Sequence, residues 1–142
     1  MSSPDIMIVF WGNPLYDGRC VNMINQFRDE KLTVKIIGVG KDNETFDFNG
    51  AEIKLINRAM LNSSLTKYFK YFKLIKRILK QESPKTIIAS DLYSLIPCAQ
   101  FTQQQKVKLI YDSREIYTQL AGLVNRPIIQ KIWSWYEKKY IY

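Results

Sequence analysis

The sequence predicts an α/β fold in which a doubly wound, mostly parallel sheet carries helices on both faces. Short apolar runs rich in β-branched residues recur along the chain, segments with helical spacing separate most of them, and polar residues directly follow several runs. Strands that alternate with helices in this way form right-handed crossovers and parallel pairs. The chain has 142 residues, of which 46% are hydrophobic and 24% charged, and this suits one globular domain over residues 1–142.

The first half of the chain contains three predicted strands and one predicted helix. The strands are compact apolar runs, and they cover Asp5–Trp11, Leu32–Val39 and Ala51–Ile56. Apolar residues at helical spacing predict a helix over Arg19–Glu30. We expect the polar segment Gly40–Gly50 to be a surface loop. After the first strand, Gly12-Asn13-Pro14 forms either a tight turn or a loop that contacts a ligand, since glycine lets the backbone approach a ligand closely.

The segment Leu65–Gln81 is the most clearly periodic one and predicts an amphipathic helix. One arc of this helix is apolar, with Tyr68, Tyr71, Phe72, Ile75, Ile78 and Leu79. The opposite arc, here called the basic arc, carries six cations and no acid: Lys67, Lys70, Lys73, Lys76, Arg77 and Lys80. Phe69 lies inside or beside the basic arc. This arc is either the solvated face of a core helix or a surface for anionic lipid headgroups or another polyanion, with Phe69 as an insertion point.

The second half continues the alternation of strands and helices. Two further strands, Lys85–Ser90 and Val107–Tyr111, flank a predicted helix over Leu92–Gln104, in which Pro97 implies a late start or a kink. An aromatic amphipathic helix then runs from about Pro127. Proline suits a first helical turn because an N–H at that position would lack an intrahelical partner.

Polar groups follow three predicted strands and are expected at one edge of the sheet, where open α/β sheets bind ligands. They are Gly12-Asn13, Ser90-Asp91 and Asp112-Ser113-Arg114-Glu115. The reversal of strand order predicts a crevice between the first strand and the strand Lys85–Ser90. Asp112 and Glu115 can act as a base or bind sugar hydroxyls, and Arg114 can hold a phosphate. Capping and mutual pairing are the alternatives for these three residues, and a helix cap is the alternative for Asp91.

Composition excludes several classes of site. Without histidine, the chain can form neither a histidine-based triad nor a histidine-ligated zinc site, and no cluster of ligands predicts another metal. Cys20 and Cys98 are isolated and are expected to be free thiols. No apolar run reaches the roughly 18 residues of a membrane span, and the first residues do not read as a secretory signal. The net charge of +8 arises in residues 67–142, which hold fourteen Lys and Arg against five Asp and Glu, whereas residues 1–66 hold seven against eight.

Motifs in the second half resemble the amino-terminal domain of GT-B glycosyltransferases, in particular the bacterial set called group 1 or family 4. There, a strand ending in Y-D-x-H-E-x-[FY] precedes a helix with a W-x-x-x-E-like segment. The matching residues here are Ile110 to Tyr117, Leu123, Arg126-Pro127, and Trp133 to Lys138, and the segment Ile87–Pro97 resembles the preceding strand and helix. Arg114 stands where that set usually has a histidine, so the sugar contact of the imidazole is not carried over.

The resemblance implies a Rossmann-like, acceptor-side domain of a two-domain enzyme, truncated before the domain that binds the nucleotide-sugar. The full-length enzyme would transfer a sugar from a nucleotide-sugar to a glycan or lipid-linked acceptor in surface polysaccharide synthesis, without a metal or a resident cofactor. This part alone would be inactive, and no catalytic residue is assigned. The basic arc fits peripheral attachment to the cytoplasmic face of the membrane, and the unfinished edge near Tyr142 would favour self-association.

Two other functions compete with sugar transfer. A non-enzymatic Rossmann-like module binding a polyanion, either a nucleic acid or an anionic membrane, would explain the basic second half. Nucleic acid is disfavoured because most aromatic residues fall on the apolar arc and would be buried, out of reach of bases. A nicotinamide or flavin oxidoreductase would need the G-x-G-x-x-G fingerprint, which the sequence lacks.

Overall fold

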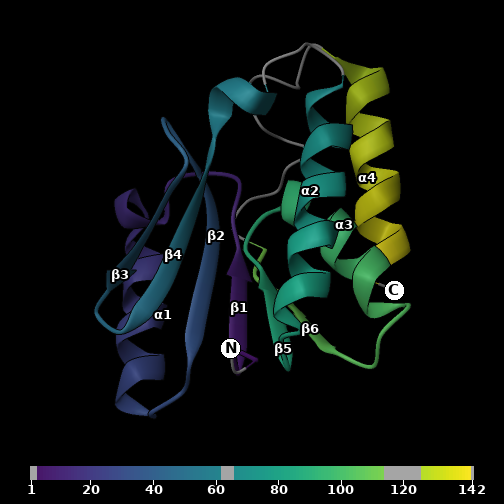
Figure 1. Cartoon of the computed structure of the whole chain (residues 1–142). Coiled ribbons are helices and arrows are strands. Elements are labelled where there is room, and N and C mark those ends of the chain that lie inside the picture. Colours follow the sequence, from purple (N-terminus) through teal and green to yellow (C-terminus); the bar gives the residue numbers. More distant parts are fainter. Residues whose placement is uncertain (1–2, 62–65, 114–125, 142) are drawn as a thin grey trace.

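The computed structural model describes residues 3–61, 66–113 and 126–141, which form a six-stranded sheet flanked by helices (Figure 1). The strand order is β3-β4-β2-β1-β5-β6, and every neighbouring pair except β3–β4 is parallel. The strands are β1 (Ile6–Val9), β2 (Val34–Gly40), β3 (Glu44–Phe48), β4 (Ala51–Asn57), β5 (Thr86–Ala89) and β6 (Lys108–Tyr111). The chain reverses its direction of winding between β1 and β5, so the predicted doubly wound α/β fold is confirmed.

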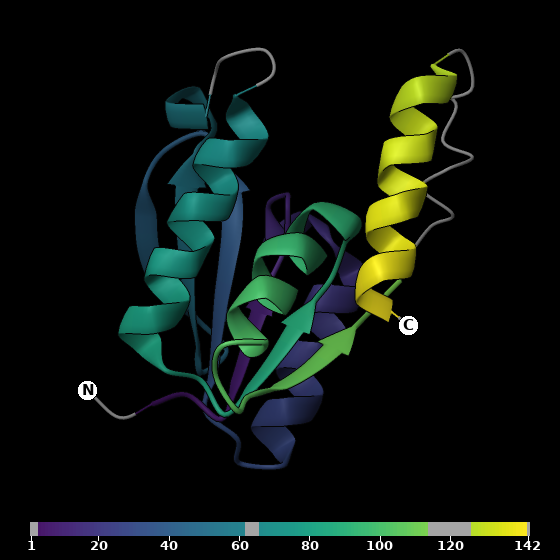
Figure 2. The ribbon, with the colours of Figure 1, turned by 90° about the vertical axis from the view of Figure 1, so that its right-hand side faces the viewer.

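The helices cover both faces of the sheet (Figures 1 and 2). They are α1 (Gly18–Asp29), α2 (Lys67–Glu82), α3 (Leu92–Thr102) and α4 (Pro127–Ile141), with short 3-10 turns η1 (Pro14–Tyr16) and η2 (Arg58–Leu61). Alternate residues of β1 point to opposite faces, so Ile8 packs in the core beneath α1 and Val9 in the core beneath α2 and α3. Cys20 and Cys98 are buried in these two different cores, which confirms that both are free thiols.

The prediction of a surface loop over Gly40–Gly50 was wrong, because this segment contains β3, the antiparallel partner of β4. Phe46 and Phe48 alternate with exposed polar residues and pack against the core on the α1 side. Asn49 and Gly50 close the hairpin with φ angles of 53° and 83°, which are typical of Asn-Gly in two-residue hairpin loops. The alternation of phenylalanines with polar residues and the Asn-Gly pair were the sequence signals of this strand. The strand is polar because it lies at the edge of the sheet.

Of the two effects expected of Pro97, a late helix start or a kink, the late start does not occur. Helix α3 begins at Leu92 and continues through Pro97 to Thr102. The side chain of Asp91 caps the helix by accepting a hydrogen bond from the N–H of Ser94. Most of α3 is buried, so packing compensates for the hydrogen bond that proline cannot donate.

The buried carboxylate of Asp91 joins the point of strand-order reversal to two helices. Only 3% of Asp91 is exposed, and it accepts hydrogen bonds from the backbone N–H groups of Trp11 (2.5 Å) and Ser94 (2.8 Å). The hydroxyl of Ser94 also donates to Asp91 (3.1 Å) and lies 2.9 Å from the hydroxyl of Tyr71 in α2. Burial, together with the nearby charge of Asp91, raises the pKa of Tyr71 well above its ordinary value. Asp91 therefore connects the loop after β1 to α3 and α2.

The absence of a side chain at Gly38 allows the loop after β1 to lie close to β2. A Cβ atom at Gly38 would lie 2.5 Å from Cδ of Pro14 and 2.7 Å from the carbonyl oxygen of Gly12. That carbonyl accepts a hydrogen bond from the N–H of Val39 (2.8 Å). The position of Gly12 at the edge of the sheet therefore depends on the glycine in β2.

Replacing Asp91 with alanine should lower the free energy of unfolding by about 2–4 kcal/mol, because the buried N–H of Ser94 and the partly buried N–H of Trp11 lose their acceptor. Urea denaturation followed by circular dichroism measures this change. Asp29→Ala is the matched control, because Asp29 is an exposed carboxylate paired with Arg28, and it should cost less than about 1 kcal/mol. Equal losses in the two variants would contradict the anchoring role of Asp91.

Replacing Gly38 with alanine should destabilise the protein by about 1–3 kcal/mol, because the new methyl group overlaps the backbone of the β1 loop. The amide resonances of Gly12 and Asn13 should shift in the same variant. At Gly18, the first residue of α1, a Cβ atom would meet nothing within 4 Å, so Gly18→Ala should leave stability unchanged or raise it by up to roughly 1 kcal/mol. If both variants unfold at the same urea concentration, the close packing at Gly38 does not constrain the loop.

Candidate functional site

The carboxyl ends of the parallel strands meet at one edge of the sheet, which brings the predicted polar groups into one region. Gly12 and Asn13 follow β1, Asp91 follows β5 and Asp112 follows β6. β5 pairs with both β1 and β6, so these three strand ends are direct neighbours. The edge is therefore the place where a ligand of this fold is expected.

Asp112 makes one backbone hydrogen bond and one ion pair at this edge. Its N–H donates to the carbonyl oxygen of Ala89 (2.9 Å), and its carboxylate lies 3.5 Å from the guanidinium of Arg19 at the start of α1. Arg114 and Glu115 lie outside the residues that the structure describes. The roles predicted for these residues in binding phosphate and sugar hydroxyls stay predictions.

The crevice predicted between β1 and β5 is filled by side chains. The ring of Trp11 lies 5.7 Å from Tyr68, 4.5 Å from Tyr71 and 5.8 Å from Tyr93, measured between ring centroids. Trp133 of α4 packs edge-on against Tyr68 and Tyr93 at 5.5 and 5.0 Å. The backbone N–H of Trp11 donates a hydrogen bond to the carboxylate of Asp91, so Asp91 anchors the loop after β1 at this edge. The predicted contact of Asp91 with substrate stays a prediction.

Two tyrosine hydroxyls near this aromatic cluster have raised pKa values. Burial raises the pKa of Tyr93, and the neighbouring Tyr68 adds to the effect. Burial also raises the pKa of Tyr111, at the end of β6, to about 12. Both hydroxyls therefore stay protonated at neutral pH, and neither is poised to act as a base.

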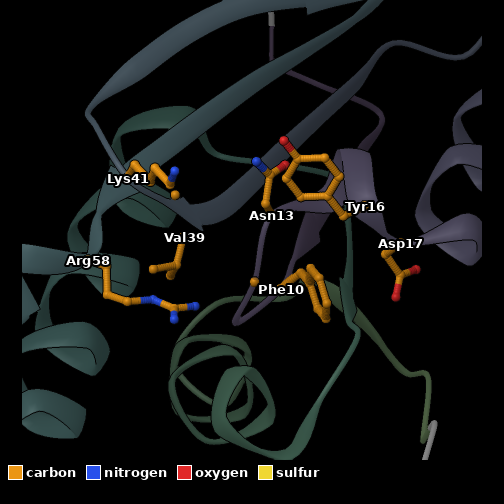
Figure 3. A pocket seen from close by; sticks show the side chains of 9 residues that line it. Phe10, Asn13, Tyr16, Asp17, Val39, Lys41 and Arg58 are labelled. Carbon is orange, nitrogen blue, oxygen red and sulfur yellow. The ribbon is translucent and has the colours of Figure 1, made fainter.

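A cavity of about 430 Å³ opens on the other side of β1, over the ends of β1, β2 and β4 (Figure 3). Its walls are formed by Phe10, Gly12, Asn13, Tyr16, Asp17, Val39, Gly40, Lys41 and Arg58. Lys41 directly follows β2 and Arg58 directly follows β4. Figure 3 shows their side chains on one side of the cavity, with those of Asn13, Tyr16 and Asp17 toward the other side. This cavity, called the edge pocket below, includes the predicted residues Gly12 and Asn13.

The edge pocket combines cations with a turn that is held by its own side chains. Among the described residues, neither Lys41 nor Arg58 forms an ion pair. Asn13 accepts a hydrogen bond from the N–H of Leu15 (3.0 Å), and Asp17 caps α1 by accepting from the N–H of Cys20 (2.8 Å). A guanidinium and an ammonium group on one wall can bind a phosphate or diphosphate. The volume falls within the range of small-molecule sites.

Sequence reasoning missed Tyr16, Lys41 and Arg58 as residues of this pocket. Lys41 and Arg58 occupy the first positions after two parallel strands, so the rule applied to the other strand ends also identifies them. Lys41 was missed because the segment Gly40–Gly50 was interpreted as a surface loop, and Arg58 was missed because the rule was not applied to the end of the predicted strand Ala51–Ile56. Nothing in the sequence marks Tyr16, which is 90% exposed at the rim of the pocket.

The basic arc of α2 faces outward, as its periodicity predicted. Tyr71, Ile75, Ile78 and Leu79 are buried on the opposite side, and Phe69 is 73% exposed. None of the six cations forms an ion pair within residues 3–61, 66–113 and 126–141. In that same part of the chain, no cluster of acidic residues and cysteines could hold a metal ion, and no helix has the length and apolar character to cross a membrane.

Comparison with known proteins gives one relative in sequence, although no protein-family model matches the chain. The chain is 26% identical, over 93% of its length, to the UDP-N-acetylglucosamine–N-acetylmuramyl-(pentapeptide) pyrophosphoryl-undecaprenol N-acetylglucosamine transferase of Caldicellulosiruptor saccharolyticus. The aligned region amounts to 40% of that relative. The sequence likeness thus extends along almost the whole of this chain but covers less than half of the relative.

A solved structure shares the fold. The apo form of the lipopolysaccharide outer core galactosyltransferase WaaB superposes with a TM-score of 0.54 and 13% sequence identity, covering 76% of this chain and 32% of that protein. At this identity the likeness concerns the fold alone. The chain therefore has a Rossmann-like fold of the GT-B type and resembles glycosyltransferases in sequence, as its motifs predicted.

Proposed function

We propose that this chain is the acceptor-side domain of a glycosyltransferase, which transfers a sugar from a nucleotide-sugar to a glycan or lipid-linked acceptor in surface polysaccharide synthesis. The observation that carries the proposal is the edge pocket of about 430 Å³, found in a chain that is similar to a sugar transferase over 93% of its length. The name of that relative specifies a UDP-linked sugar and a pyrophosphoryl-undecaprenol acceptor, and the solved neighbour is a galactosyltransferase.

The edge pocket suits the binding and orientation of such an acceptor. Lys41 and Arg58 can hold the two phosphates of a pyrophosphoryl group. Asn13 and Asp17, toward the other side of the pocket, offer an amide and a carboxylate to sugar hydroxyls. In this proposal the nucleotide-sugar is a substrate held mainly by a second domain, and the chain needs neither a resident cofactor nor a metal.

The protein should bind a soluble acceptor mimic, N-acetylmuramyl diphosphate with a methyl group in place of the polyprenyl chain, in preference to UDP-N-acetylglucosamine. Arg58→Gln should weaken binding of the mimic roughly tenfold or more, because one charge-assisted contact to phosphate is lost. Isothermal titration calorimetry measures both affinities. Arg28→Gln on α1 removes the same charge outside the pocket and should have no effect. Equal effects of the two variants, or a preference for the nucleotide-sugar, would refute the acceptor-side assignment.

We further propose that the basic arc attaches the protein peripherally to the cytoplasmic face of the membrane. Six cations without described ion pairs are distributed along α2, and Phe69 in the same helix is 73% exposed. Each Lys or Arg near an anionic bilayer contributes about 1 kcal/mol, and an inserted aromatic ring adds apolar burial. Such attachment would bring the edge pocket to the surface where lipid-linked acceptors are presented.

Charge reversal of Lys70, Lys73 and Arg77 to glutamate should abolish co-sedimentation with vesicles of phosphatidylglycerol and phosphatidylcholine. The loss follows because the surface attraction of three cations is replaced by repulsion. Binding of the unaltered protein should weaken as salt is added and should be absent with pure phosphatidylcholine.

The matched control reverses Arg28, Lys31 and Lys108, which are exposed outside α2, and should retain binding. If the variant on α2 binds as well as this control, the basic arc does not attach the protein to membranes. Preferential, salt-sensitive binding to single-stranded oligonucleotides would instead favour a non-enzymatic polyanion-binding module. The structure gives that alternative little support, because Tyr71 is fully buried and Tyr68 packs against the rings of Trp11, Tyr93 and Trp133 instead of facing nucleic-acid bases in solvent.

A further inference from the structure

Two depressions of different chemistry adjoin each other on the surface formed by α2, α3 and α4. The first, here called the apolar groove, has a volume of about 440 Å³ and apolar walls made by Phe69, Phe72, Ile96 and Tyr136. The second, called the basic depression, has a volume of about 400 Å³ and is lined by Lys73, Lys76, Arg77 and Lys80. Lys73 and Lys76 line both, so the apolar groove leads directly into a group of four cations.

A lysine at this junction is held in place by neighbouring helices. The ammonium group of Lys76 donates to the side-chain oxygen of Gln100 in α3 (3.1 Å). The amide of Gln100 in turn donates to the hydroxyl of Tyr140 in α4 (3.2 Å). Lys76 is therefore ordered before a ligand arrives, which lowers the entropic cost of binding an anion there.

Figure 2 shows that α2 and α4 begin at the same end of the molecule, and exposed apolar residues lie near both starts. Phe69, near the start of α2, is 73% exposed and touches Phe72 edge-on at 6.5 Å. Ile128 and Ile132, in the first half of α4, are 75% and 48% exposed. The basic depression lies toward the opposite end of α2, at Lys80. A molecule with a phosphate at one end and a long apolar chain at the other matches this arrangement.

We propose that the apolar groove and the basic depression together bind one anionic phospholipid of the bilayer. One acyl chain lies against Phe69, Phe72 and Tyr136, and the phosphate is held by Lys73 and Lys76. This inference rests on the membrane attachment proposed above and deepens it, from a charged surface to a site for a single lipid. Charge complementarity identifies the occupant, because the described lining of both depressions contains four cations and no carboxylate.

The position of the basic depression argues against the lipid-linked acceptor as the occupant. The start of α2 lies at the carboxyl edge of the sheet, where Tyr68 contacts Trp11. Lys80 and Gln104 lie near the opposite ends of α2 and α3, away from that edge. A phosphate in the basic depression, which extends from Lys73 and Lys76 to these residues, would keep an attached sugar away from Lys41 and Arg58 in the edge pocket. A structural lipid of the membrane has no such requirement.

The test titrates the protein with dioctanoyl phosphatidylglycerol below its critical micelle concentration, using isothermal titration calorimetry and native mass spectrometry. One equivalent should bind. Lys73→Gln combined with Lys76→Gln should weaken this binding roughly tenfold or more, since charge-assisted contacts to the phosphate are lost. Glycerol 3-phosphate, which lacks the chain, should bind at least roughly tenfold more weakly, since it buries no methylene groups. Lys73 is exposed and Lys76 is half-buried, so circular dichroism should first check that the double variant is folded.

The matched control combines Lys108→Gln with Lys131→Gln, which removes the same charge from exposed positions of β6 and α4 outside both depressions, and should change the affinity less than about twofold. Equal weakening by the two pairs would overturn the proposal in favour of a diffuse charge effect. Equal binding of glycerol 3-phosphate would overturn the lipid site in favour of a simple anion site. Tighter binding of farnesyl diphosphate would overturn the choice of a phospholipid as the occupant.

The single-lipid site and membrane attachment can fail separately. Vesicle binding without single-lipid binding would refute the single-lipid site and leave membrane attachment intact. Loss of vesicle binding and of single-lipid binding would refute both proposals.

Discussion

The buried carboxylate of Asp91 is the interaction on which the carboxyl edge of this sheet depends. A carboxylate that is 3% exposed is tolerated only when its oxygens are hydrogen-bonded, and here the partners come from the loop after β1 and from the first turn of α3. The hydroxyl of Tyr71 extends the network to α2. The point where the strand order reverses is thereby tied to both helices that cover this face.

This anchoring decides which side of β1 is open. On the side of β5, the hydrogen bond from Trp11 to Asp91 and the rings packed above it fill the space that a doubly wound sheet commonly offers to a ligand. On the side of β2, Gly38 lets the β1 loop lie close to the sheet, and the edge pocket forms beside it. The pocket therefore takes its cations, Lys41 and Arg58, from the ends of β2 and β4.

The molecule presents two surfaces with distinct chemistry. The edge pocket combines two cations with an amide, a carboxylate and an exposed tyrosine, which suits a phosphorylated sugar. The surface of α2, α3 and α4 combines an apolar groove with a basic depression, which suits a phospholipid. The loop after β1, which borders the edge pocket, and helices α2 and α3 are joined by the same buried network, so attachment to a bilayer and orientation of an acceptor would be coupled through it.

The sequence by itself determined the features that depend on local pattern. Alternating apolar runs and helical segments determined the α/β fold, polar residues after strands determined the edge at which we propose the site, and the periodicity of α2 determined which side of that helix is buried. Tertiary structure alone decided the burial of Asp91, the filling of the predicted crevice and the convergence of Lys41 and Arg58. The hairpin at β3 had a local signal, but its place at the edge of the sheet was set by pairing with β4. These outcomes depend on strand register and on how side-chain volumes fit between elements distant in the chain, which local periodicity does not encode.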